Sequence, residues 1–322
     1  MNHRPPLLLL AALLATSAPA AAQQKYPLKS VRLILPFTAG SAVDTLARIY
    51  ADHMTQSWGQ QVLVDNRPGA NGIIGMEAIA KAPPDGYTLG MGNIATLAIN
   101  SSLYPKLPYD SLRDYAPISY TAAITNCLIV HPSLPVKSVK ELVALAKARP
   151  KEINYASGGV GSAQHIPMEL LRALTGINVV HVAYKGLTPA FNDVVAGHVP
   201  MMISGLVTAL PHHKSGRVRI LGTTGTKRSE AAPDIPAIAE SVPGYEGNSW
   251  TGFFAPAATP ADIVSRVNAE VVRIGQLPAT RERLSGLGFE IVGSAPEAFA
   301  ALIRNDTARL GKVIREAGIR AE

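Results

Sequence analysis

The chain has 322 residues, of which 47% are hydrophobic and 16% charged, proportions of a well-packed globular protein that exclude a disordered chain. Its formal charge is +7, but the lysines and arginines are scattered without a continuous basic run, which argues against a nucleic-acid partner and leaves small anionic ligands open. The single cysteine, Cys127, excludes an internal disulfide and a cysteine-based zinc site, and its apolar neighbours predict a buried strand position.

Residues 1–22 have the features of a secretory signal. A short basic start precedes an apolar run of about ten residues and a group of alanines that ends at Ala22. The run is shorter than the roughly 20 residues that span a bilayer, although an uncleaved anchor or a buried helix is the alternative. We therefore expect cleavage near Ala22 and a soluble protein outside the cytoplasm. The remainder is long enough that two lobes are the default expectation.

Short β-branched runs then alternate with amphipathic stretches, which predicts an α/β fold. The first expected elements are a strand at 31–36, a helix at 42–58, a strand at 61–64, a helix at 73–81 and a strand at 87–91. The second series is an extended stretch at 118–131, a helix at 138–150, a strand at 153–156, a helix ending near 174, a strand at 178–184, a helix at 188–196, and strands at 200–204 and 218–223. The last are a strand at 249–255, a helix opened by 259–262 and a helix at 296–317. Because each series contains a strand, a glycine-containing turn and a helix, we expect two similar lobes with a ligand between them.

The turn PFTAGSAVD at 36–44 follows the first strand and precedes the first helix. Ser41 and Asp44 have the spacing of a capping box, in which the serine accepts from the backbone at the third helical residue and the acid reaches back. Capping does not exclude binding, because the remaining amide groups of the first turn can still hold an anion.

The stretch YASGGVGSAQH at 155–165 has the same position in the second series, with more glycine. Its glycines allow close backbone approach to a ligand, although a turn that only needs positive φ is the alternative. The stretch completes neither a Walker A loop nor a dinucleotide-binding fingerprint. His165 either faces the cleft or caps the helix locally, and both readings stay open.

The sequence gives little support to catalysis. It contains neither a G-x-S-x-G elbow nor an H-E-x-x-H helix, and no nucleophile is paired with a base. His212 and His213 lack the spacing of a metal pair, and we expect them on a solvated loop before Gly216. A triad assembled in space keeps a secreted hydrolase, using a serine or Cys127, as a weak alternative.

Taken together, several motifs resemble the Bug (TctC-like) family of periplasmic solute-binding proteins associated with tripartite tricarboxylate transporters. The matching stretches are PFTAGSAVDTLAR, VLVDNRPGANGIIG, PPDGYTLGMG, INYASGGVGSAQH, VAYKGLTPAFNDVVAGHV and VPGYEGNSWTGFFAPAATPADIV. They cover nearly the whole chain after the signal.

The resemblance implies a periplasmic location and a type II periplasmic-binding-protein fold, with two α/β lobes that close on a ligand. The expected division is a signal peptide at 1–22, a first lobe at 23–124 and 247–322, and a second lobe at 125–246. The implied ligand is a small organic carboxylate, and the implied partners are membrane permease subunits. We expect a monomer without cofactor, metal or catalytic activity. A sensor that reports ligand to a membrane kinase is the alternative.

The ligand-binding residues follow from the positions that match the family motifs. The first-lobe residues are Phe37, Thr38, Ala39, Gly40, Ser41, Asp44 and Asn93. The second-lobe residues are Ser157, Gly158, Gly159, Gly161, Ser162, His165, Tyr184, Lys185 and Gly186. Lys185 is expected either to neutralise a second carboxylate or to face solvent. Ser41 stands where the family often has a glycine, which leaves the ligand identity open.

Overall fold

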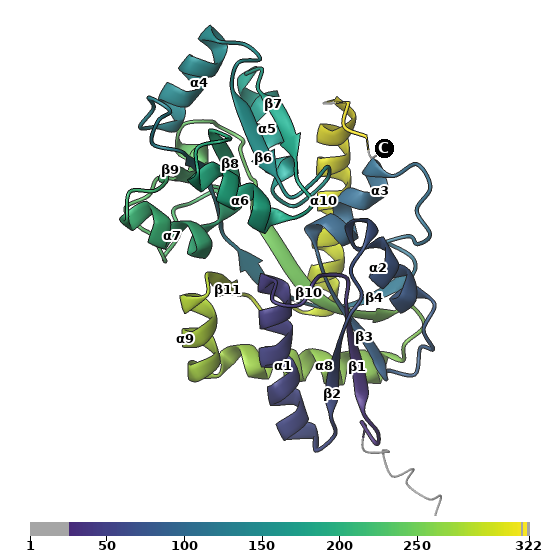
Figure 1. The fold of residues 1–322 in the computed structure, drawn as a ribbon. Coiled ribbons are helices and arrows are strands. Elements are labelled where there is room, and N and C mark those ends of the chain that lie inside the picture. Colours follow the sequence, from purple (N-terminus) through teal and green to yellow (C-terminus); the bar gives the residue numbers. More distant parts are fainter. Residues whose placement is uncertain (1–25, 317, 321–322) are drawn as a thin grey trace, which may run out of the picture.

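The computed structural model describes residues 26–316 and 318–320, which form two α/β lobes, each built round one sheet (Figure 1). The first lobe contains a six-stranded sheet of order β11-β4-β10-β3-β1-β2, and the second a five-stranded sheet of order β7-β6-β8-β5-β9. The predicted signal segment, residues 1–22, lies outside the described residues. Within those residues, no helix has the length and apolar character needed to cross a membrane.

The strands of each sheet come from separate parts of the chain. In the first lobe they are β1 (Val31–Leu35), β2 (Val62–Asn66), β3 (Thr88–Asn93), β4 (Tyr115–Ile124), β10 (Ser249–Pro256) and β11 (Phe289–Ile291). In the second lobe they are β5 (Asn126–Val130), β6 (Asn154–Ser157), β7 (Val180–Ala183), β8 (Met201–Gly205) and β9 (Arg219–Thr223). The strands β1, β2 and β3 are parallel, as are β6, β7 and β8, so in each lobe the loops that follow parallel strands emerge at one edge.

Helices cover both sheets. The first lobe carries α1 (Ala42–Trp58), α2 (Ile73–Ala80), α3 (Asn100–Leu103), α8 (Ala261–Gln276), α9 (Pro278–Gly286) and α10 (Pro296–Glu316). The second carries α4 (Val139–Ala148), α5 (His165–Thr175), α6 (Leu187–Val195) and α7 (Leu206–Lys214). Three short helical turns lie at Ala70–Gly72, Ala95–Ile99 and Ile238–Glu240.

The helix predicted at 42–58 is present as α1, and its apolar residues lie on one buried face. Leu46, Ile49, Tyr50 and Met54 are buried in one core cluster with the apolar residues of β1 and β3. The helix ends at Gly59, which adopts the left-handed conformation that favours glycine. Burying this stripe anchors the start of α1 and therefore the loop in front of it.

Two predictions for single segments were wrong. The extended stretch at 118–131 is not one element, because it divides at Thr125 into β4 of the first sheet and β5 of the second. His212 and His213 lie in the last turn of α7 rather than on a loop, where basic groups suit the negative end of the helix dipole. Cys127 is fully buried on β5, as predicted.

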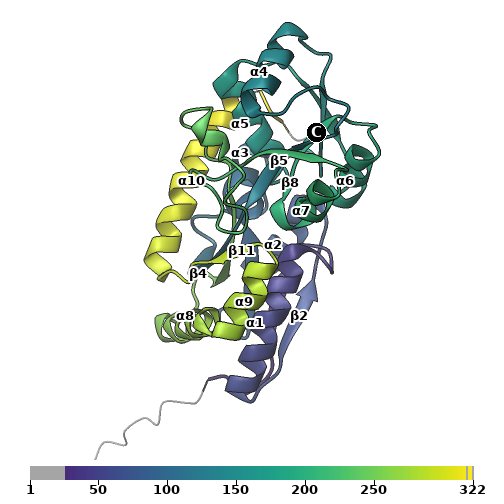
Figure 2. The same cartoon turned by 90° about the vertical axis from the view of Figure 1, so that its left-hand side faces the viewer.

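The chain crosses between the sheets at Thr125 and again between β9 and β10, and α10 ties the lobes together. Within the first lobe, Asp306 on α10 accepts a hydrogen bond of 2.6 Å from the indole Nε1 of Trp250 on β10. Farther along the helix, Val313 packs into the core of the second lobe. Figure 2 shows α10 running along one edge of both lobes. The junction between the lobes is therefore packed as well as linked.

Candidate functional site

The turn at 36–41 joins β1 to α1, and Ser41 is the N-cap of the helix. The Ser41 Oγ accepts a hydrogen bond of 3.2 Å from the Asp44 amide, so the predicted serine cap is confirmed. The carboxylate of Asp44 reaches one residue farther back than predicted and accepts from the Gly40 amide at 2.9 Å. Gly40 has a φ of +77°, a conformation that glycine adopts without steric cost.

Asp44 also binds two side chains outside the turn. It accepts from the Arg48 Nε at 3.0 Å and from the Asn66 Nδ2 at 2.9 Å, and Asn66 donates in addition to the Phe37 carbonyl at 3.1 Å. Burial alone would raise the pKa of Asp44, but hydrogen bonds from Arg48, Gly40 and Asn66 outweigh it and lower the pKa. The buried carboxylate therefore braces the turn from behind.

The turn retains amide groups that no protein acceptor uses. Thr38, Ala39 and Gly40 are exposed, as is Ala42, the first residue of α1. Among residues 37–43, the N–H groups that lack an acceptor in the described part of the chain are those of Phe37, Thr38, Ala39, Ala42 and Val43. Such groups at the start of a 17-residue helix form a site suited to an anion.

The loop at 157–164 joins β6 to α5 in the second lobe. Gly159 and Gly161 have φ values of +124° and +74°, so the loop does need positive φ. Ser157 is fully buried, with its Oγ 2.7 Å from the His181 Nε2 and 3.1 Å from the Gly159 amide. The Ser162 Oγ accepts from the His165 amide at 3.2 Å. Both serine hydroxyls therefore shape the loop itself.

His165 is buried as the first residue of α5 and makes the local contact that the sequence left open. The Gly161 amide donates to its Nδ1 at 3.1 Å, so Nδ1 is unprotonated and the proton of the neutral ring lies on Nε2. The Nε2 is 3.8 Å from the Glu169 Oε1. Burial, with smaller effects of His181 and Arg172, lowers the pKa of His165 to about 3.

A buried polar cluster lies behind this loop. The rings of Tyr155, His165 and His181 stack, with 4.0 Å between the two imidazole centroids. Glu169, at 2% exposure, accepts a hydrogen bond from the Tyr155 hydroxyl and pairs with Arg172 at 2.7 Å. Glu169 was not among the predicted residues, because an acid on an amphipathic helix usually faces solvent.

This loop also retains unused amide groups. The N–H groups without an acceptor in the described part of the chain are those of Gly158, Val160, Ala163 and Gln164. Gly158, Val160 and Gln164 are partly exposed. The two loops thus offer the same chemistry, main-chain donors without fixed charge.

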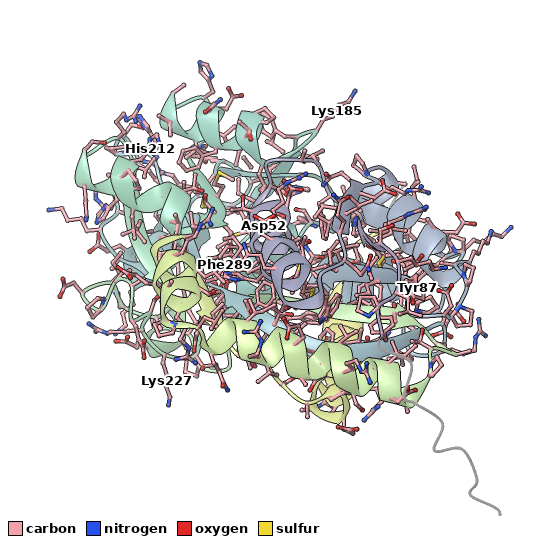
Figure 3. All side chains as sticks on the ribbon, turned by 90° about the horizontal axis from the view of Figure 1, so that it is seen from below. Asp52, Tyr87, Lys185, His212, Lys227 and Phe289 are labelled. Carbon is pink, nitrogen blue, oxygen red and sulfur yellow. The ribbon has the colours of Figure 1, made fainter. Side chains whose placement is uncertain are left out.

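The other predicted residues have more local roles or point away. Asn93 ends β3, and its Oδ1 accepts from the Ala95 and Thr96 amides at 3.0 and 3.2 Å. The Tyr184 hydroxyl donates to Asp193 at 2.6 Å, and this hydrogen bond raises the pKa of Tyr184 to about 12. Lys185 is exposed and projects outward from the second lobe (Figure 3). Gly186, the N-cap residue of α6, has a φ of +120°.

Each loop meets the opposite lobe, although at different places. Gly40, Ala42 and Thr45 line a cavity of about 230 Å³ together with residues 205–208 at the end of β8 and the start of α7. Gly161 instead lies against Leu103 and Asn71 of the first lobe. None of the residues that line this cavity belongs to the loop at 157–164. The start of α7 was not among the predicted ligand-binding segments. The strand–glycine–helix pattern at 201–210 could have indicated it, because it repeats the pattern of the other two loops.

The comparisons with known proteins identify the family. The model of the family described as "Tripartite tricarboxylate transporter family receptor" (TctC) matches residues 46–319. The chain belongs to the TctC family. It is 34% identical over 322 residues to Protein BugT of Bordetella pertussis, with 99% of each chain covered. It is 39% identical over 293 residues to a protein encoded in the tcbD-tcbE intergenic region of a Pseudomonas species, covering 90% of this chain and 87% of the relative.

Solved structures confirm the predicted fold. One is Rpa4515 of R. palustris with adipate, which has a TM-score of 0.85 and 36% identity over 92% of this chain and 100% of the other. Another is MatC of Rhodopseudomonas palustris with bound malate, with a TM-score of 0.81 and 30% identity over 90% of this chain and 100% of the other. This TctC-family chain is therefore a periplasmic solute-binding protein by family and fold, and not an enzyme.

Proposed function

We propose that this protein captures a small organic carboxylate between its lobes and delivers it to a tripartite tricarboxylate-type permease. It acts as a monomer in the periplasm, after its signal is removed near Ala22. The observation that carries the proposal is the set of unused amide groups at two loops on different lobes. Adipate and malate, the ligands of the two structural relatives, are both carboxylates.

The chemistry of the two loops favours an anion over a cation or a neutral solute. Backbone N–H groups at helix starts donate to carboxylate oxygens and place the ligand at the positive end of the helix dipole. Each helix end contributes about 0.3–1 kcal/mol at an exposed site. Closure of the lobes would remove water and strengthen these hydrogen bonds.

A thermal-shift screen tests the ligand class. Mono-, di- and tricarboxylates, including adipate and malate, are compared with the methyl esters of the same acids, esterified at every carboxyl group, which keep the carbon skeleton but lack the charge. An acid at about 100 times its Kd stabilises the protein by roughly 2.7 kcal/mol, and its ester should not. Stabilisation by amines or esters, with no response to any acid, would contradict the proposal.

Delivery to a permease needs a separate test. The ligand selected by the screen is offered as a radiolabelled solute to cells that contain or lack the gene for this protein. Uptake that depends on both this gene and the permease genes supports delivery. Unchanged uptake, together with altered phosphorylation of a membrane kinase, would instead favour the sensor alternative.

A further inference from the structure

The cavity of about 230 Å³ between the lobes is lined by the starts of two helices, one from each lobe. The lining residues at the start of α1 are Gly40, Ala42 and Thr45, and those at the start of α7 are residues 205–208. The N–H groups of Val207 and Thr208 have no acceptor in the described part of the chain, and the same is true of Ala42. Both helix starts therefore offer main-chain donors to the same cavity.

None of the described residues that line this cavity has a charged side chain. The charge of a bound carboxylate is therefore met there by main-chain and hydroxyl donors alone. Two of the three lining threonines, Thr45 and Thr208, lie in the first turns of α1 and α7, beside the free N–H groups. The helix starts are thus the end of the cavity that suits a carboxylate.

An apolar surface, called the hydrophobic wall below, lines another part of the cavity. It consists of Ile124 at the end of β4, Leu287 directly after α9, and Phe289 on β11. Phe289 is opposite Ile124 in the antiparallel pairing of β11 with β4, so the two side chains are neighbours on one face of the sheet. Thr125, next to Ile124, is the third lining threonine and the only hydroxyl away from the helix starts.

The hydrophobic wall lies beside the donors of α7. Gly288, between Leu287 and Phe289, has a φ of +79°, and a Cβ at this position would lie 2.1 Å from the Cγ2 of Val207. The turn that carries the wall therefore packs directly on the first turn of α7, in the opposite lobe. A ligand whose carboxylate binds at this helix start brings its carbon chain against the wall.

We propose that the hydrophobic wall selects carboxylates with an unsubstituted hydrocarbon chain over polyhydroxylated acids of the same chain length. The inference rests on the proposed carboxylate binding and names the kind of carbon chain that the site accepts. Hydrocarbon gains free energy when it is buried against the wall. A hydroxyl group buried there loses its water, and the side chains of the wall offer no hydrogen bond in exchange. The single hydroxyl of Thr125 does not replace the water of several such groups.

Three pairs of acids test this selection. They are succinate with tartrate, adipate with galactarate, and hexanoate with gluconate. The members of a pair have the same number of carbons and carboxylates, but the second acid carries two or more hydroxyl groups. Isothermal titration of the wild-type protein should show at least about tenfold tighter binding of the unsubstituted acid in each pair that binds.

Two variants test the role of the wall. Leu287→Asn keeps a similar volume but adds an amide that can pair with a ligand hydroxyl. Leu287 is 38% exposed, so the variant should fold with a melting temperature close to that of the wild type. Its preference for the unsubstituted acid should fall at least threefold. Leu174→Asn is the matched control, because Leu174 on α5 is 44% exposed and is not among the residues that line the cavity. This control should retain the wild-type preference.

Three results would overturn the inference alone. The first is a wild-type protein that binds carboxylates but binds no unsubstituted acid more tightly than its hydroxylated partner. The second is an unchanged preference in Leu287→Asn, which would place the selection away from the wall. The third is an equal fall in Leu174→Asn, which would show that the change does not act through the cavity. Failure of every carboxylate to bind would overturn the proposed function, and this inference with it.

Discussion

The loops at 36–41 and 157–164 are each supported by a buried carboxylate paired with an arginine, an arrangement called a brace below, but the two braces differ. On α1, the buried Asp44 pairs with Arg48 and accepts directly from the Gly40 amide. On α5, the buried Glu169 pairs with Arg172 but reaches its loop through His165, which accepts from the Gly161 amide. The second brace therefore contains an imidazole between the carboxylate and the loop. Only that brace should respond to pH near neutrality.

The largest expected effect is a loss of stability in mild acid. Burial holds the pKa of His165 at about 3, below its ordinary value of 6.5, so the unfolded chain binds a proton first as pH falls. The stability that depends on a neutral His165 is fully present above pH 6.5 and declines toward pH 3. At about 1.4 kcal/mol per pKa unit, the total loss is up to roughly 5 kcal/mol. Burial also lowers the pKa of the adjacent His181, which acts in the same direction.

Urea unfolding at pH 7, 5.5 and 4.5 measures this effect. His165→Asn, which keeps an acceptor near the Nδ1 position, should lose less than half as much stability over this range as the wild type. In Asp44→Asn, the unfolding free energy should change with pH as in the wild type. The pKa of Asp44 is lowered, so the stability that its ionised carboxylate provides is lost only below about pH 4. The explanation fails if both variants show the wild-type slope.

Breaking the buried pair on α5 should have the next largest effect. Glu169→Leu leaves the buried Tyr155 hydroxyl without its acceptor and Arg172 without its partner, so we expect a loss of about 3 kcal/mol. The same substitution at Glu77, a partly exposed acid paired with Lys81 on α2, should change stability by less than about 0.5 kcal/mol. Equal losses in urea unfolding would show that Glu169 has no special role.

The two braces differ in how far apart their residues lie in the sequence, and this difference explains which of them could be predicted. The cap of Ser41 depends on residues three positions apart, so its spacing is visible in the chain. The family motifs likewise indicated two lobes and both loops. The second brace joins Tyr155 on β6, His181 on β7 and Glu169 on α5, and nothing local indicates that they meet.

The Asp44–Arg48 pair should contribute less to stability than the Glu169–Arg172 pair, because water reaches Arg48. Asp44→Asn should cost about 2 kcal/mol, since the amide cannot accept from Gly40, Arg48 and Asn66 together. Asp52→Asn is the control on the same helix, where the acid is exposed and carries no hydrogen bond within the described residues. Thermal unfolding at pH 7.5 should place this control within about 0.5 kcal/mol of the wild type. A larger loss from Asp52→Asn than from Asp44→Asn would contradict the assignment.

The smallest expected effect distinguishes how closely each of the two loops contacts the opposite lobe. Gly40 and Gly161 have nearly the same φ, +77° and +74°, so alanine at either position introduces the same backbone strain, about 1 kcal/mol. A Cβ at Gly40 would have no neighbour within 4 Å, whereas one at Gly161 would overlap Leu103 of the first lobe.

Gly161→Ala should therefore cost about 1 kcal/mol more than Gly40→Ala, because Leu103 lies in a packed core that resists added volume. The excess should shrink in the double variant Gly161→Ala with Leu103→Val, which removes the overlapping atom, when Leu103→Val alone is used as the reference. An excess that persists unchanged would place the strain within the second loop. An excess that shrinks would show that this loop, unlike the exposed turn at 38–40, is held in place by the opposite lobe as well as by its own brace.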